Sequence, residues 1–127
     1  MSDLRAAAEA ARAQAYAPYS KFRVGAALEA ADGTVFVGCN VENASYGLTN
    51  CAERAAIAAA VVAGHREFRR IAIVADADAP VSPCGACRQV LREFGPHLEI
   101  ISYGTATEQR WTMTDLLPDA FDPRVLP

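Results

Sequence analysis

The sequence Pro83-Cys84-Gly85-Ala86-Cys87 places two thiols three positions apart directly after a proline, and Cys51-Ala52-Glu53 adds a third thiol further up the chain. Structural zinc usually takes four protein ligands, whereas catalytic zinc takes three and keeps a water molecule in the fourth position. These three thiols therefore predict a zinc site with one open position. Glu53 stands two residues after the first thiol, where its carboxylate can serve that water as a base.

The pattern around these motifs predicts an α/β fold. In chain order, the predicted elements are a helix over 4–15, strands over 23–30 and 35–39 joined by a turn at 32–33, a helix over 51–63, a strand over 71–75, a helix over 82–94, a strand over 98–103 and a short helix over 112–117. Strands that alternate with helices imply a mixed sheet with parallel crossovers and helices on both faces. We therefore expect residues 1–127 to form one three-layer α/β/α domain with a mixed central sheet of about five strands.

Capping and breaking residues predict where the helices begin and end. Ser2 is expected to cap the first helix and Pro18 to terminate it. Asn50 is expected to cap the helix that carries Cys51, and Ser82 the next one, with Pro83 at its first position. The positive ends of two helix dipoles would then meet at the thiols and lower their pKa values.

Two residues beside the thiols are candidates to support the site. Three thiolates on Zn²⁺ leave a net negative charge, which disfavours the ionisation of water, so a nearby cation would help. Arg54 is expected to donate to a thiolate sulfur, the alternative being an arginine on a solvated helix face. Gln89 either supports its helix near the metal or lies on a solvated face.

Other interpretations of these residues are weaker. Glu53 with Asn50 is nearly a capping box, which would make the glutamate a structural partner of the backbone. A thioredoxin-like pair of Cys84 and Cys87 would leave Cys51 and Glu53 unexplained. A closed four-cysteine site would need Cys39, but a single cysteine at a strand end is more often a small core residue.

Composition excludes some partners. The 127 residues are 52% hydrophobic and 21% charged, as in globular proteins, and the formal net charge is −3, which argues against binding to nucleic acid. The sequence shows neither a signal peptide nor an apolar run long enough to cross a membrane. We expect a cytoplasmic, reducing environment, in which thiols are more often metal ligands than disulfide partners.

The motifs combine into a family resemblance. The stretches that carry it are Tyr16-Ala17-Pro18-Tyr19-Ser20-Lys21-Phe22-Arg23-Val24-Gly25-Ala26-Ala27, Gly38-Cys39-Asn40-Val41-Glu42-Asn43-Ala44-Ser45-Tyr46-Gly47, Cys51-Ala52-Glu53-Arg54 and Ser82-Pro83-Cys84-Gly85-Ala86-Cys87-Arg88-Gln89. Over nearly its whole length the chain resembles the small homotetrameric class of zinc-dependent cytidine deaminases. The zinc motif is shared by many deaminases, whereas Asn40-Val41-Glu42-Asn43 points to a nucleoside.

The resemblance implies a cytidine deaminase-like fold and a reaction. Cytidine and 2′-deoxycytidine would be hydrolysed to uridine and 2′-deoxyuridine plus ammonia, with one Zn²⁺ per subunit held by Cys51, Cys84 and Cys87. Glu53 would move a proton from water to N3 of the base and then to the leaving amine. The assembly would be a homotetramer with its sites at subunit interfaces.

The resemblance also assigns residues to the substrate. Asn40 and Glu42 correspond to residues that bind the ribose 3′-hydroxyl, Phe22 to one that packs on the ligand, and Ala52 to one that lines the site. Alternate residues of a strand end face the same way, so an amide and a carboxylate there can grip a neutral sugar. Without the resemblance, Asn40 and Glu42 would be read as polar residues that close a hairpin.

Two aromatic residues are assigned to subunit contacts by the same resemblance. Tyr46 and Phe121 correspond to interface residues, and Phe121 would complete the site of a neighbouring subunit. Asp119 stands where relatives often carry a smaller or neutral residue, so the tail around Phe121 departs from the pattern. The rival functions are deamination of another aminopyrimidine, such as blasticidin S, and a non-enzymatic zinc or redox module.

Overall fold

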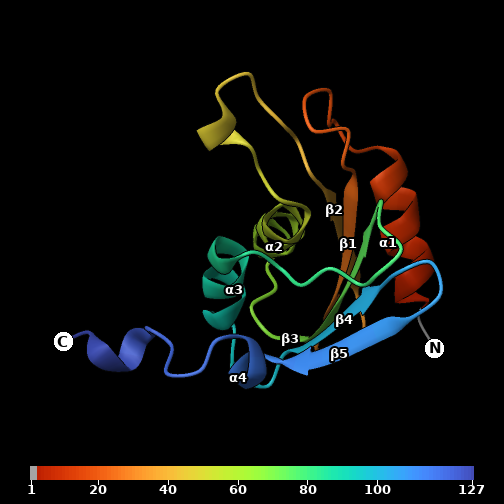
Figure 1. The fold of residues 1–127 in the computed structure, drawn as a ribbon. Coiled ribbons are helices and arrows are strands. Elements are labelled where there is room, and N and C mark those ends of the chain that lie inside the picture. The colour runs from red at the N-terminus through yellow and green to blue at the C-terminus, as the bar shows by residue number, and fades with distance from the viewer. Residues whose placement is uncertain (1–2) are drawn as a thin grey trace.

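The computed structural model describes residues 3–127, which form a five-stranded mixed sheet with the order β2-β1-β3-β4-β5 (Figure 1). The elements are α1 (Leu4–Ala13), β1 (Val24–Ala30), β2 (Val35–Cys39), the short 3₁₀ helix η1 (Tyr46–Leu48), α2 (Ala52–Val62), β3 (Phe68–Ala75), α3 (Gly85–Arg92), β4 (Glu99–Tyr103), β5 (Glu108–Thr112), α4 (Met113–Leu116) and the 3₁₀ helix η2 (Pro123–Val125). The strands β3 and β4 are parallel, and the other neighbouring pairs are antiparallel.

Helices cover both faces of the sheet, which confirms the predicted three-layer arrangement. Alternate residues of β1 enter two different cores, as the pleat of a strand requires. Ala26 and Leu28 pack in the core beneath α2 and α3, whereas Ala27 packs with Leu4 and Ala8 beneath α1. The middle strand β3 is buried from Ile71 to Ala75, as the continuous apolar run predicted.

Glycines in β1 and β2 let the helices approach the sheet closely. A Cβ atom at Gly25 would lie 2.0 Å from the carbonyl oxygen of Ala8 in α1. A Cβ atom at Gly38 would lie 2.4 Å from the carbonyl oxygen of Ala52 in α2, on the other face. The start of α2, which carries Cys51 and Glu53, is therefore seated directly on the sheet at Gly38.

The strands differ from the sequence-based prediction in two respects. The sheet has a single parallel pair among the described residues, made by the crossover through α3, because β1 and β2 form a hairpin and β1 pairs antiparallel with β3. The fifth strand, β5, was not located from the sequence. It lies at the sheet edge with no fully buried residue, so the apolar alternation that marks a strand is missing.

The first helix is also bounded differently from the prediction. Asp3 caps α1, since its Oδ1 accepts the N–H of Ala6 at 3.0 Å, and the predicted cap Ser2 lies outside the described residues. The helix ends at Ala13, well before Pro18, because the chain turns there to join Val41: Tyr16 and Val41 form a parallel bridge. At the other end of the chain, α4 is the predicted short helix.

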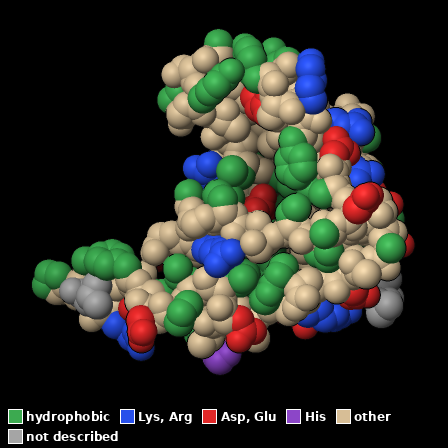
Figure 2. Space-filling model, in the orientation of Figure 1, with side chains coloured by type: hydrophobic (Ala, Val, Ile, Leu, Met, Phe, Trp, Pro, Cys, Tyr) green, Lys and Arg blue, Asp and Glu red, His purple; other side chains and the backbone are tan. Residues whose placement is uncertain are grey.

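Two segments project from the body of the molecule (Figure 1). One is the arm, residues 41–50, which includes η1; the other is the tail, residues 117–127, which ends the chain. Hydrophobic side chains gather on both projections (Figure 2), with Tyr46 73%, Leu48 71% and Phe121 61% exposed. No helix among the described residues has both the length and the apolar character needed to cross a membrane.

Candidate metal centre and active site

Three sulfur atoms from two helix starts meet at one point. The Sγ atoms of Cys51, Cys84 and Cys87 lie within 4.8 Å of one another. Cys51 is the N-cap residue of α2 and Cys84 that of α3, and Cys87 lies in the first turn of α3. The crossover between β3 and β4 thus brings the positive ends of two helices to the same thiols.

The predicted caps Asn50 and Ser82 were wrong. Asn50 exchanges two backbone hydrogen bonds with Val41, at 2.9 Å each, and this bridge keeps it extended. Ser82 and Pro83 lie before the N-cap residue Cys84 in a segment without regular secondary structure, and α3 begins at Gly85. Neither cap cysteine uses its sulfur to cap its helix, and both sulfurs face the cluster instead.

The cluster carries negative charge on the Cys51 sulfur, which would attract a cation. The pKa of Cys51 is lowered to about 5, first by the hydrogen bond from Cys87 and then by the guanidinium of Arg54. Arg54 donates from Nη2 to the Cys51 sulfur at 3.2 Å. The pKa of Cys87 is raised, because its proton is held by Cys51 and its thiol is buried.

This donor set fits zinc. Zinc–sulfur bonds of about 2.3 Å in tetrahedral geometry place thiolates roughly 3.8 Å apart, compatible with the observed cluster. Cys39 lies at the end of β2, outside the group of three, so a closed four-cysteine site is not formed by these residues. Three soft ligands leave a tetrahedral ion one position for water or substrate.

Glu53 is buried beside the cluster, with 5% of its surface exposed. Burial raises the pKa of its carboxyl group, and the nearby Cys51 thiolate acts in the same direction. Because Cys51 and not Asn50 caps α2, and makes no side-chain capping bond, the capping-box interpretation of Glu53 is wrong. A carboxyl group whose pKa is raised by burial is suited to accept and return a proton near neutral pH.

A cavity of about 220 Å³ opens in front of these groups. It is lined by Phe22, Val24, Asn40, Thr49, Cys51, Ala52, Glu53, Ile73, Val81, Ser82 and Cys84. An apolar wall with few polar groups is typical of a small-molecule site. Phe22, Asn40 and Ala52, which the resemblance assigns to the substrate, therefore lie around the same space as Glu53. Thr49 and Val81 also line it, although no motif in the sequence singled them out.

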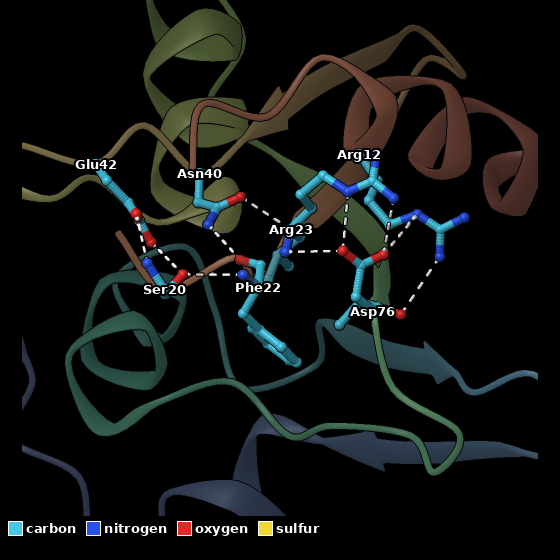
Figure 3. Close-up of polar contacts among 9 residues, drawn as sticks. Arg12, Ser20, Phe22, Arg23, Asn40, Glu42 and Asp76 are labelled. Atoms are coloured by element: carbon cyan, nitrogen blue, oxygen red, sulfur yellow. Dashed lines mark hydrogen bonds and ion pairs between the residues drawn. The ribbon is translucent and has the colours of Figure 1, made fainter. Parts of the chain in front are cut away.

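Glu42 lies in a neighbouring hollow of about 190 Å³, which shares Thr49 with the first and is also lined by Tyr46. Its carboxylate accepts the backbone N–H groups of Tyr19 at 3.0 Å and Ser20 at 3.1 Å, and the Ser20 hydroxyl (Figure 3). The hydrogen bond from Ser20 is the main cause of its lowered pKa. Glu42 is therefore an ionised carboxylate that also fastens the loop before Phe22.

Three other residues named from the sequence lie in different surroundings. Tyr46 is in the exposed arm, with its ring centroid 5.8 Å from that of Tyr19. Gln89 is exposed, and its Nε2 donates to the carbonyl oxygen of Phe121 at 2.8 Å, so it fastens the tail and not the cluster. The Phe121 side chain does not line the cavity of its own chain.

Arg88 is a supporting residue that sequence reasoning missed. Its guanidinium donates to the carbonyl oxygen of Pro83 at 2.7 Å, to the Ser82 hydroxyl at 3.0 Å and to the carbonyl oxygen of Leu116 at 2.9 Å. These bonds tie the segment before Cys84 to the end of α4. An arginine directly after a cysteine ligand was the available signal, but its partners are distant in sequence.

Known proteins match this chain over most of its length. Residues 2–104 match the family model described as the cytidine and deoxycytidylate deaminase zinc-binding region. The cytidine deaminase of Sporosarcina psychrophila is 52% identical over 120 residues, covering 93% of this chain and 88% of the relative. That of Mycobacterium tuberculosis is 46% identical over 124 residues, covering 98% and 91%. The crystal structure of cytidine deaminase from Burkholderia pseudomallei superposes with a TM-score of 0.91 at 54% identity, covering 95% of this chain and all (100%) of that chain.

Proposed function

The chain belongs to the zinc-binding cytidine deaminase family, and on this basis we propose that it hydrolyses cytidine to uridine and ammonia. One observation carries the proposal: three thiols able to hold zinc and the buried carboxyl group of Glu53 line or adjoin one cavity of small-molecule size. The same site is proposed to accept 2′-deoxycytidine.

The metal would be held by Cys51, Cys84 and Cys87. When bound, Zn²⁺ supplies a Lewis acid that lowers the pKa of water far below its bulk value. Arg54 offsets part of the thiolate charge through its bond to the Cys51 sulfur, which favours ionisation of that water.

Glu53 is proposed to move the protons. It takes a proton from water as the water oxygen bonds to C4 of the base, and delivers this proton to N3. The second proton of the water then passes to the exocyclic amine, the C4–N bond breaks, and ammonia leaves. The product retains a carbonyl group at C4 and a proton on N3, which is uridine.

The sugar is proposed to bind Asn40 and Glu42, with Phe22 packing on the ligand. A carboxylate offers about four acceptor positions, so Glu42 can accept a hydrogen bond from the 3′-hydroxyl in addition to the bonds from Tyr19 and Ser20. Both cytidine and deoxycytidine carry that hydroxyl. A 3′-phosphate would face the Glu42 charge, which disfavours nucleic acid as a substrate.

The proposed assembly is a homotetramer with one zinc ion per subunit. Its support is the exposed apolar surface of the arm and tail, which a second copy would cover, and the position of Phe121 outside its own chain's cavity. Tyr46 and Phe121 would then contribute to interfaces, with Phe121 reaching a neighbour's site.

The free thiols of the cluster suit a reducing compartment, and we propose that the protein acts in the cytoplasm.

The test is to incubate the purified protein with cytidine, follow the ultraviolet change and ammonia release, and measure zinc. Uridine formation with bound zinc is expected. Zinc or redox-active thiols without turnover of any aminopyrimidine would favour a binding module instead.

A second experiment separates cytidine from blasticidin S as the substrate. Glu42→Gln should raise KM for cytidine, because the charged acceptor for the 3′-hydroxyl is lost. Glu108→Gln is the control, since it makes the same chemical change on the edge strand β5, away from the hollow that holds Glu42. Unchanged cytidine kinetics in Glu42→Gln, with turnover of blasticidin S, would favour the rival substrate.

A further inference from the structure

The short segment 22–24, which supplies two residues of the cavity wall, is held by side chains from other parts of the chain (Figure 3). The Phe22 N–H donates to the Ser20 hydroxyl oxygen at 3.0 Å. Asn40 brackets the segment, since its Nδ2 donates to the Phe22 carbonyl oxygen and its Oδ1 accepts the Val24 N–H, each at 2.9 Å. The backbone around Phe22 is thus fixed before regular pairing in β1 begins.

Asp76 holds the middle of this segment. It directly follows β3, and its Oδ2 accepts the backbone N–H of Arg23 at 3.1 Å, while its own N–H donates to the Arg23 carbonyl oxygen at 3.0 Å. The same carboxylate accepts Arg23 Nε at 2.9 Å, and Arg12 Nε lies 3.8 Å away. These bonds, with the Arg23 guanidinium first, lower the pKa of Asp76.

Packing alone does not fix the orientation of Phe22. Its side chain is in the open cavity wall and the residue is 38% exposed, so packing within the chain covers only part of it. The direction of such a ring depends on the conformation of its backbone, and hydrogen bonds fix that conformation. A carboxylate bond to an N–H group is charge-assisted and stronger than a neutral one, which makes Asp76 a principal anchor of the segment.

We propose that Asp76 is a positioning residue for substrate binding, which acts by holding the Arg23 backbone so that Phe22 faces the cavity. The inference rests on the proposed function. The thiols and Glu53 come from α2 and α3, whereas Asp76 acts on the segment that leads into β1. Loss of Asp76 should therefore weaken substrate binding and leave the chemical step intact.

The backbone bond, and not the ion pair, carries this role. The side chains of Arg23 and Asp76 are 49% and 27% exposed, and a solvated ion pair contributes little. Arg23→Ala removes the guanidinium but keeps the N–H group that Asp76 accepts. Asp76→Ala removes both interactions, so the two variants separate the two explanations.

The experiment measures kcat and KM for cytidine in holoenzyme variants. Asp76→Ala is expected to raise KM roughly three- to tenfold with kcat within about twofold, which is the range for loss of one ordinary hydrogen bond, because Asp76 acts on the substrate only through Phe22. Asp76→Asn keeps an acceptor oxygen and should raise KM less, and it also serves if Asp76→Ala does not fold. Arg23→Ala should leave KM within about twofold.

Asp78→Ala is the matched control. Asp78 is a carboxylate of the same loop, but its Oδ1 accepts the Thr105 hydroxyl at 3.3 Å and so holds a different segment. Equal KM effects of Arg23→Ala and Asp76→Ala would overturn the proposal, as would a lower Tm for Asp76→Ala with unchanged KM.

Hydrogen exchange of the Arg23 amide separates failure of this inference from failure of the proposed function. The amide should be protected in the wild-type protein and in Arg23→Ala, and lose protection in Asp76→Ala. Unchanged protection in Asp76→Ala would overturn the anchor. Loss of protection in a protein that does not act on cytidine would overturn the proposed substrate and, with it, the role in binding cytidine.

Discussion

Glu53 combines burial with a raised pKa, and the proposed reaction asks it to carry protons between water and the base. We predict that Glu53→Gln lowers kcat by about 10²- to 10⁴-fold, the usual contribution of a general acid–base group. Zinc content should be unchanged because the three thiols remain. The Tm should not fall at neutral pH, since burial already disfavours the charged carboxylate that the amide replaces.

Glu108→Gln, on the exposed edge strand β5, is the control for this prediction, and it should leave kcat unchanged. Turnover close to normal in Glu53→Gln would remove Glu53 from the proposed mechanism. A large loss of zinc in the same variant would assign the residue to metal retention.

At the level of residues, the sequence predicted what depends on local spacing. The thiol cluster came from the positions of Cys84 and Cys87 in one helix turn with Cys51 at another helix start. The cap at Asn50 failed because its pairing with Val41 is a contact between segments, which spacing does not reveal. The hydrogen bond from Arg88 to Leu116 could not be predicted either, because it also joins segments that are distant in sequence.

Two glycine substitutions, one beneath the helix on each face of the sheet, test the close packing of helix on sheet. Gly38→Ala would place a methyl group against the backbone of α2, and Gly25→Ala would place one against α1. Each should destabilise the fold by about 2 to 3 kcal/mol or more through overpacking. Gly38→Ala should also lower zinc content and kcat, because α2 carries Cys51 and Glu53, whereas Gly25→Ala should spare both.

Thermal unfolding, zinc analysis and turnover of the folded fraction check this pair. Equal losses of zinc in the two variants would show that the packing of α2 on Gly38 does not position Cys51 and Glu53. An unchanged Tm in both would contradict the close helix–sheet approach.

Among the elements, those with a strong apolar pattern were predicted and those without one were not. The buried strand β3 is predicted by its apolar run, and the hairpin of β1 and β2 by its alternating pattern and the turn between the strands. The edge strand β5 has charged and polar residues on an open edge, as edge strands often do to avoid pairing with other chains. Its position follows from pairing with β4, which the sequence does not display.

An ion pair between Asp122 and Arg92 of α3 fastens the tail to the rest of the molecule, so the attachment of the tail depends on pH. Asp122 accepts hydrogen bonds from Arg92 at 2.8 Å and from Arg124 at 2.9 Å. The bonds from Arg124 and the charge of Arg92 lower the pKa of Asp122 below the unfolded value. The unfolded chain then takes up the proton first, so this stabilisation is complete above about pH 4 and is lost as pH falls through the folded pKa.

The wild-type protein should therefore have a higher Tm than Asp122→Asn at pH 5 to 8, with a difference that narrows below about pH 4. Comparison with Asp122→Asn at each pH cancels the effect of acid on zinc binding, which both proteins share. A difference that stays constant down to the lowest pH at which both fold would contradict the linkage.

The whole molecule brings two helix starts together so that a zinc ion in the three-thiolate site, beside Glu53, can carry the proposed reaction. The most direct test is to remove zinc with a chelator, measure uridine formation from cytidine, and then restore Zn²⁺. We predict that activity falls in proportion to the zinc removed and returns when the ion is added back. A metal-free protein that converts cytidine at the original rate would exclude a role for zinc in the reaction.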